Sequence, residues 1–77
     1  MKVVLYSKVG CHLCDEARAL LDELAAEVDF ELIEVEILDD PALYERYKYR
    51  IPVVAINGVE ALEGRFDQAD LRVAMDR

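Results

Sequence analysis

The chain has 77 residues, of which 55% are hydrophobic and 34% charged, a balance typical of one globular domain with a small core over residues 1–77. Its 17 acidic and 9 basic residues leave a net charge of −8, which argues against a nucleic-acid partner, since phosphates require a basic face. The longest apolar runs are only a few residues, far short of the roughly 20 that cross a bilayer, so no membrane partner is expected.

The first half of the chain predicts a strand, a helix and a second strand. Residues 2–6 are mostly apolar on both faces, as in a strand covered on both sides. Between residues 13 and 28, apolar side chains recur at steps of three and four, which indicates one face of a helix. In residues 30–37, apolar side chains alternate with Glu34 and Glu36. This alternation predicts an edge strand with one solvated face.

The N-terminal residues 1–6 favour a strand over a signal peptide, because they carry a single lysine and no long apolar region follows it. We therefore expect a cytoplasmic protein. In that compartment a lone cysteine pair is more often catalytic or metal-binding than structural.

The second half begins with a short helix and a hairpin. Asp40-Pro41 supplies a capping carboxylate followed by proline at the first helical position, and predicts a helix over residues 41–47. Residues 53–56 and 59–63 are strand-like. They flank Asn57-Gly58, a strong hairpin signal because both residues tolerate positive φ.

A last helix is predicted from its cap, Asp67, through about residue 75, with Phe66 and Leu71 at the positions of a hydrophobic staple. The resulting order is β-α-β-α-β-β-α. Because a strand–helix–strand unit implies a right-handed parallel connection, we expect an α/β fold with a four-stranded mixed sheet and helices on both faces.

Cys11-His12-Leu13-Cys14 holds the only two cysteines and lies between the first strand and the first helix. Two cysteines at this spacing can close a disulfide with little backbone movement. A helix N-terminus also offers unpaired N–H groups and positive partial charge to a thiolate, which lowers a thiol pKa. The segment is therefore interpreted first as a redox site.

Within this segment we expect Cys11, at the helix start, to be the nucleophile and Cys14, one turn further in, to be the less exposed resolving thiol. Lys8 either adds positive charge near Cys11 or is an ordinary loop lysine. His12 either stabilises thiolates as a cation or is an exposed residue of the first turn without a large effect.

The whole chain resembles glutaredoxins and small glutaredoxin-like proteins of the thioredoxin fold. The resemblance is carried by the segment Tyr6 to Cys14, by Ile51-Pro52-Val53 where the family has a cis-proline, by Asn57-Gly58, and by Gly64 to Asp67. It implies a cis Ile51-Pro52 peptide facing the cysteines, with the backbone of Ile51 free to pair with an extended substrate.

The resemblance also implies a substrate-binding surface formed by Lys8, His12, Ile51, Pro52, Arg65 and Asp67. Asp67 either simply caps its helix or also places N–H groups for a carboxylate. His12-Leu13 replaces the usual Pro-Tyr, and Arg50, Arg65 and Phe66 stand where the family has smaller or different residues. We therefore expect weak glutathione binding, with Lys8, Arg50 and Arg65 as its available cations if their loops converge.

The leading hypothesis is a monomeric dithiol–disulfide oxidoreductase that binds no cofactor, reduces a disulfide-containing protein or glutathione, and uses glutathione as a possible reductant. The alternative is a metal-binding or iron–sulfur protein that uses the same cysteines. A self-contained zinc site is not expected, because two cysteines and the histidine between them supply at most three ligands. A redox-inactive adaptor is disfavoured by the intact cysteine pair.

Overall fold

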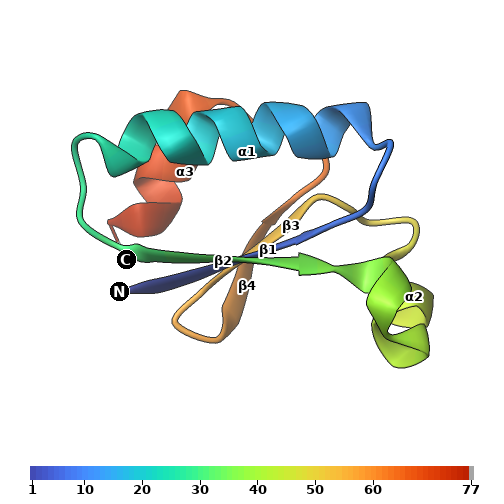
Figure 1. The fold of residues 1–77 in the computed structure, drawn as a ribbon. Coiled ribbons are helices and arrows are strands. Elements are labelled where there is room, and N and C mark those ends of the chain that lie inside the picture. Colours follow the sequence, from blue (N-terminus) through green and yellow to red (C-terminus); the bar gives the residue numbers. More distant parts are fainter. Residues whose placement is uncertain (77) are drawn as a thin grey trace.

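The computed structural model describes residues 1–76, which form a four-stranded mixed sheet and three α-helices (Figure 1). None of the helices among these residues is long and apolar enough to cross a bilayer. The predicted order β-α-β-α-β-β-α is confirmed, with one short 3₁₀ turn, η1, that was not predicted. The elements are β1 (Lys2–Ser7), α1 (His12–Ala25), β2 (Glu31–Glu36), η1 (Ile37–Asp39), α2 (Pro41–Tyr47), β3 (Val53–Ile56), β4 (Val59–Glu63) and α3 (Gln68–Met75).

The strands lie in the order β2-β1-β3-β4. β1 pairs in parallel with β2 and antiparallel with β3, and Asn57, with φ of +50°, and Gly58, with φ of +85°, turn the chain from β3 into its antiparallel partner β4. β2 is therefore an edge strand, as predicted.

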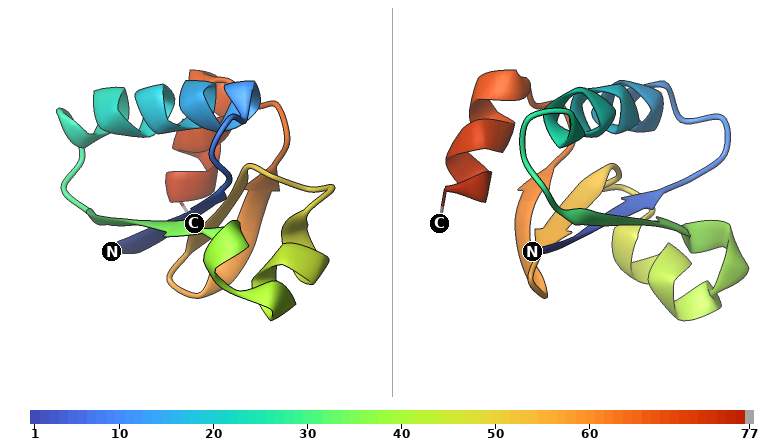
Figure 2. Two further views of the ribbon diagram at one scale, coloured as in Figure 1. Left: turned by 45° about the vertical axis from the view of Figure 1, so that its right-hand side comes forward. Right: turned by 60° about the vertical axis from the view of Figure 1, so that its left-hand side comes forward.

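The main core lies between the sheet and the helices α1 and α3, which cover the same face (Figures 1 and 2). Residues of β1 and β3 that point to this face pack against the apolar stripe of α1, and α3 closes the end of the layer. The buried members of this core are Val3, Leu5, Ala17, Leu21, Leu24, Val54, Ile56, Leu71, Ala74 and Met75.

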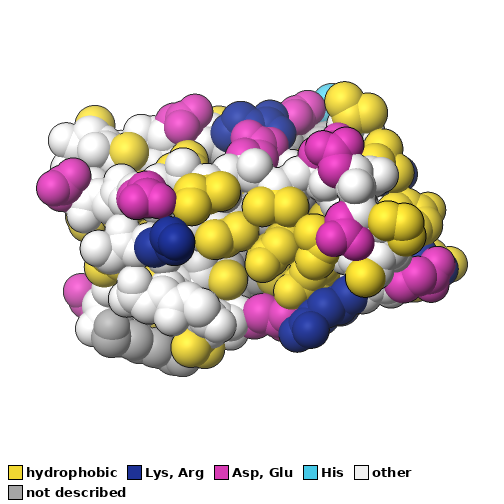
Figure 3. All heavy atoms as spheres, turned by 60° about the horizontal axis from the view of Figure 1, so that its bottom comes forward, with side chains coloured by type: hydrophobic (Ala, Val, Ile, Leu, Met, Phe, Trp, Pro, Cys, Tyr) yellow, Lys and Arg dark blue, Asp and Glu magenta, His cyan; other side chains and the backbone are white. Residues whose placement is uncertain are grey.

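The opposite face of the sheet is covered at one end by α2, as Figures 1 and 2 show. Tyr47 of α2 is buried with Ile37 and Val53, and its ring stacks on Tyr6 with centroids 4.4 Å apart. Helices thus lie on both faces of the sheet, as predicted. The view in Figure 3 shows hydrophobic side chains gathered on the face that it presents, with charged side chains around them.

The strand predicted over residues 30–37 is shorter, because the chain enters η1 at Ile37. The alternation predicted that its glutamates form a freely solvated row, and this prediction is wrong because both Glu34 and Glu36 accept hydrogen bonds. Glu34 is in register with Leu5 and Glu36 with Ser7, two buried residues of β1. Because side chains of paired residues point to the same face, these carboxylates lie on the α1 side of the sheet, at its edge.

Candidate redox site

The cysteine segment and the Ile51-Pro52 step lie at the same end of the sheet. Tyr6, near the end of β1, is in register with Val53, the first residue of β3. The loop that follows β1 and the residues that precede β3 therefore leave the sheet side by side (Figure 1). The Ile51-Pro52 bond is cis, as the resemblance implied.

A tight turn delivers Cys11 to the start of α1. The Cys11 N–H donates to the Lys8 carbonyl at 3.2 Å, and Gly10 adopts φ of +81°. A four-residue turn with positive φ at its third residue favours glycine there, since a Cβ would be strained. Cys11 itself has extended backbone geometry and is the N-cap of α1.

The two thiols are joined in a disulfide and differ sharply in exposure. The Cys11 Sγ accepts a hydrogen bond from the Cys14 N–H at 3.2 Å, the bond by which a capping side chain satisfies a free N–H of the first turn. The Cα atoms lie 5.2 Å apart, inside the usual disulfide range. Cys14 is 0% exposed, whereas Cys11 is half-buried, so an incoming group reaches the Cys11 sulfur first.

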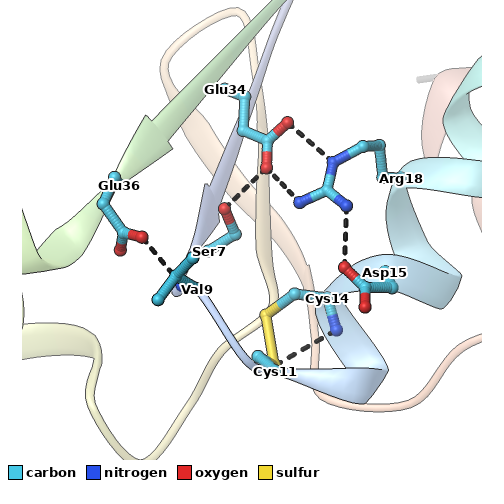
Figure 4. A network of polar contacts seen from close by, with 8 residues as sticks. All are labelled: Ser7, Val9, Cys11, Cys14, Asp15, Arg18, Glu34 and Glu36. Atoms are coloured by element: carbon cyan, nitrogen blue, oxygen red, sulfur yellow. Dashed lines mark hydrogen bonds and ion pairs between the residues drawn. A yellow bond between two sulfur atoms is a disulfide. The ribbon is translucent and has the colours of Figure 1, made fainter.

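A network of polar side chains, which we call the bracing network, connects this segment to β2 (Figure 4). Glu34 accepts a hydrogen bond from the buried Ser7 hydroxyl at 2.8 Å and pairs with both Nε and a terminal nitrogen of Arg18. Arg18 also pairs with Asp15 in the first turn of α1, at 2.8 Å. The network therefore links the end of β1, the start of α1 and the edge strand through side chains alone.

Glu36 holds the next residues of the same loop. One of its carboxylate oxygens accepts the Val9 N–H at 2.7 Å and the other accepts the Leu38 N–H at 3.2 Å. Val9 lies in the turn that leads to Cys11 and is 76% exposed, so its backbone is held while its side chain points to solvent.

The charges in this network favour the ionised state of each partner. The Arg18 guanidinium, aided by the Ser7 hydroxyl and opposed by partial burial, holds the pKa of Glu34 below its usual value. The hydrogen bonds that Arg18 donates to Glu34, and then to Asp15, raise the pKa of Arg18. Because one guanidinium serves both carboxylates, Arg18 offsets only part of the negative charge of Asp15, the residue next to Cys14 in sequence.

The remaining residues expected at the site fall on two sides of the cysteine segment. Lys8 lines a hollow of about 430 Å³ shared with the network, and His12 is exposed at the first position of α1. Arg65 and Asp67 line a different groove, between α1 and α3.

Asp67 is the N-cap of α3, with a complete capping box. Its side chain accepts the Asp70 N–H at 2.9 Å, and the Asp70 side chain accepts the Asp67 N–H at 3.0 Å. The first of these bonds is the main cause that lowers the pKa of Asp67.

Arg50 does not join Lys8 and Arg65 in a positive patch. Its guanidinium pairs with Glu60 and, at 3.0 Å, with Glu63, and lies 5.3 Å from the Tyr47 ring centroid. The expectation that this arginine is available to a glutathione carboxylate is therefore wrong, because β4 already supplies it with two carboxylates.

The expectation about Ile51 needs a correction as well. Its N–H donates to the Tyr47 carbonyl at 3.1 Å, where the chain leaves α2. Within residues 1–76, no group donates to the Ile51 carbonyl. An extended substrate beside Pro52 would therefore find one backbone partner at this residue and not two.

Sequence reasoning missed the bracing residues Ser7, Arg18, Glu34 and Glu36. A signal was available in Ser7, which continues the buried parity of Val3 and Leu5 and as a buried hydroxyl needs a partner.

A disulfide between one buried and one half-buried cysteine, a cis-proline and a mixed four-stranded sheet define a thioredoxin-fold protein of the small, glutaredoxin-like type. Thioredoxin 1 of Thermosipho africanus has the same fold, with a TM-score of 0.73 at 16% identity over 100% of this chain and 92% of its own.

The chain belongs to the glutaredoxin-like domain family (DUF836), whose sequence profile matches residues 2–75. It is similar to a protein of X. campestris of known structure, with 39% identity and a TM-score of 0.81 over 96% of this chain and 95% of that one. A Nitrosomonas europaea protein shares 32% identity and a TM-score of 0.78, over 94% and 87%. An uncharacterized protein of Mycobacterium tuberculosis is 27% identical over 99% of this chain and 84% of its own. Together these findings support a redox-type function.

Proposed function

We propose that this chain is a thiol–disulfide oxidoreductase that reduces disulfides of protein partners with the Cys11 and Cys14 dithiol. The observation that carries the proposal is the position of Cys11. Cys11 is half-buried, and its sulfur caps α1 and accepts the Cys14 N–H, while Cys14 is fully buried. An N-cap position stabilises a thiolate, which is the form of cysteine that attacks disulfides.

In the proposed reaction, the reduced protein attacks with the Cys11 thiolate. The substrate S–S bond breaks, one substrate thiolate leaves and takes up a proton, and a mixed disulfide joins Cys11 to the substrate. Cys14 then loses its proton and attacks the Cys11 sulfur, which releases the second substrate thiol. The protein gives up two electrons and becomes the disulfide form, while the substrate gains two electrons and two protons.

The other proposed site residues hold the substrate near these sulfurs. Beside Pro52, the Ile51 carbonyl accepts one backbone N–H of an extended substrate, a single-bond form of strand addition. We propose that Lys8 and His12 border the path to Cys11, and that Arg65 and Asp67 border the groove between the helices.

Regeneration requires a reductant outside this chain, for which we propose glutathione or a protein dithiol. The direction of electron flow, from dithiol to substrate, requires a reducing compartment, and we propose the cytosol.

The experiment that tests the proposal compares two cysteine variants. Incubated with a peptide disulfide, Cys14→Ser should accumulate a mixed disulfide that mass spectrometry detects and dithiothreitol removes. Cys11→Ser, the matched control, should form none and should show no reductase activity. Equal trapping on both variants, or faster alkylation of Cys14 than of Cys11 in the reduced protein, would contradict the assignment.

A further inference from the structure

A groove runs along α1 away from the redox site, between α1 and α3. Its main part has a volume of about 540 Å³ and is lined by Glu16, Ala19, Leu20, Glu23, Arg65, Phe66, Asp67 and Asp70. A narrower hollow continues it towards the cysteines and is lined by Leu13, Glu16, Ala17, Gly64, Arg65 and Phe66. Leu13 belongs to the Cys-His-Leu-Cys segment, so the groove extends to the residue that precedes Cys14.

The groove is acidic above an apolar floor. Four carboxylates line its main part against one guanidinium, while Leu20 and Phe66 pack against the core beneath it. Glu16 and Glu23 are exposed and form no ion pair with any residue in 1–76. Asp67 stays ionised at neutral pH, since the Asp70 N–H holds its pKa below the usual value.

From these observations we infer that the groove receives an extended, basic segment of the partner protein, in which Lys or Arg lies within about five residues of the reactive cysteine. The inference rests on the proposed function for the chemistry at Cys11, and adds the class of substrate.

The length of the groove agrees with such a segment. Leu13 and Glu23 are ten residues apart on α1, or about 15 Å at 1.5 Å per residue. An extended chain covers that distance in about five residues. Basic side chains of the partner would meet Glu16 near the cysteines and Glu23 at the far end, and its apolar side chains would contact Leu20 and Phe66.

Other occupants fit the groove less well. Glutathione carries two carboxylates, which the groove's carboxylates repel, and Arg65 is the one cation in the lining. A bound metal ion is disfavoured because, among residues 1–76, no three His, Cys, Asp or Glu side chains are grouped so as to hold one.

The test uses two matched cysteine peptides, one with two lysines and one with two glutamates within five residues on each side of the cysteine. Single-turnover reduction of each homodisulfide by the reduced protein is measured at about 20 mM and 500 mM NaCl. Each rate is divided by the rate with dithiothreitol, which removes differences in intrinsic reactivity. The basic peptide should be reduced about tenfold faster at low salt, and the preference should shrink to about twofold at high salt.

The matched variants separate the groove from the charge of the whole protein. Glu16→Gln/Glu23→Gln should lose most of the preference. Asp22→Asn/Asp29→Asn removes the same two charges outside the groove lining and should keep it. Equal losses in both double variants, or no preference in the unmodified protein, would overturn the inference.

A binding measurement distinguishes this inference from the proposed function. Fluorescence anisotropy with peptides that carry Ser in place of Cys needs no redox chemistry. If the basic Ser peptide binds more tightly than the acidic one, and only the groove variant loses this difference, the groove assignment stands even if neither disulfide is reduced. In that case it is the oxidoreductase proposal that fails. If the two Ser peptides bind equally, the groove assignment is overturned, whatever the reductase activity.

Discussion

Replacement of Glu34 by alanine tests whether the bracing network stabilises the cysteine segment. The substitution removes two interactions of different kinds. The ion pair with Arg18 joins side chains that are 36% and 37% exposed, so solvent screening limits it to about 0–1 kcal/mol. The Ser7 hydroxyl, in a residue only 3% exposed, would lose its partner, which costs about 1–3 kcal/mol.

Together these terms predict that Glu34→Ala lowers the free energy of unfolding by about 2 kcal/mol. That is a large fraction of the roughly 4–12 kcal/mol expected for a chain of this length. Ser7→Ala removes the hydroxyl along with its hydrogen bond and should cost less, about 0.5–1.5 kcal/mol. In the Glu34→Ala background, Ser7→Ala should be nearly neutral, because no unpaired hydroxyl remains.

The unmodified protein, Glu34→Ala, Ser7→Ala and the double variant form a double-mutant cycle. Urea unfolding of the oxidised proteins, followed by far-UV circular dichroism, measures the stability of all four. With a slope on the order of 1 kcal/mol per M, a loss of about 2 kcal/mol lowers the midpoint by about 2 M. The expected coupling between the two sites is about 1 kcal/mol or more. Additive losses, or a cost for Glu34→Ala below about 0.5 kcal/mol, would show that Ser7 finds another partner and that the network is not a brace.

Four further predictions concern one helix cap, one core residue and two titrating groups. Asp67→Ala should lower stability by about 0.5–2 kcal/mol, with Asp67→Asn retaining most of it, as measured by thermal unfolding. Leu21→Ala, at a position 0% exposed, should cost about 2–5 kcal/mol in urea unfolding. Burial, then the Glu60 carboxylate, raises the pKa of Tyr47 to about 12. Tyrosinate absorbance should therefore show a late step, absent in Tyr47→Phe, and Tyr47 should lose its contribution to stability as pH rises from about 10 to 12. Arg50, then Tyr47, lowers the pKa of Glu60 to about 2. Its contribution should be complete above about pH 4.5 and lost towards pH 2, with a smaller acid loss in Glu60→Gln.

The elements could be predicted because their ends are set by local chemistry. Asp40-Pro41 starts α2, Asn57-Gly58 turns β3 into β4, and Asp67 starts α3 at the expected residues. Each of these signals depends on a few neighbouring residues and so is visible in the sequence. The start of α1 at the first cysteine was visible for the same reason.

The contacts that surround the cysteines could not be predicted in the same way. Whether Glu34 meets solvent or Arg18 depends on the register between β1 and β2, which are separated by the whole of α1. Arg50 directly precedes the cis Ile51-Pro52 peptide in sequence, yet its guanidinium pairs with two glutamates of β4. The N–H of Ile51 is used by the preceding helix. These pairings join distant segments, and composition or periodicity does not encode them.

The capping role of the Cys11 sulfur connects the folding of α1 to the redox state of the cysteine pair. The same atom that satisfies an N–H of the first turn of α1 also closes the disulfide. Whatever stabilises its thiolate at the helix start stabilises the reduced protein, and by thermodynamic linkage makes the disulfide a stronger oxidant. Substitutions elsewhere in the first turn of α1 can therefore tune the reduction potential without touching either sulfur.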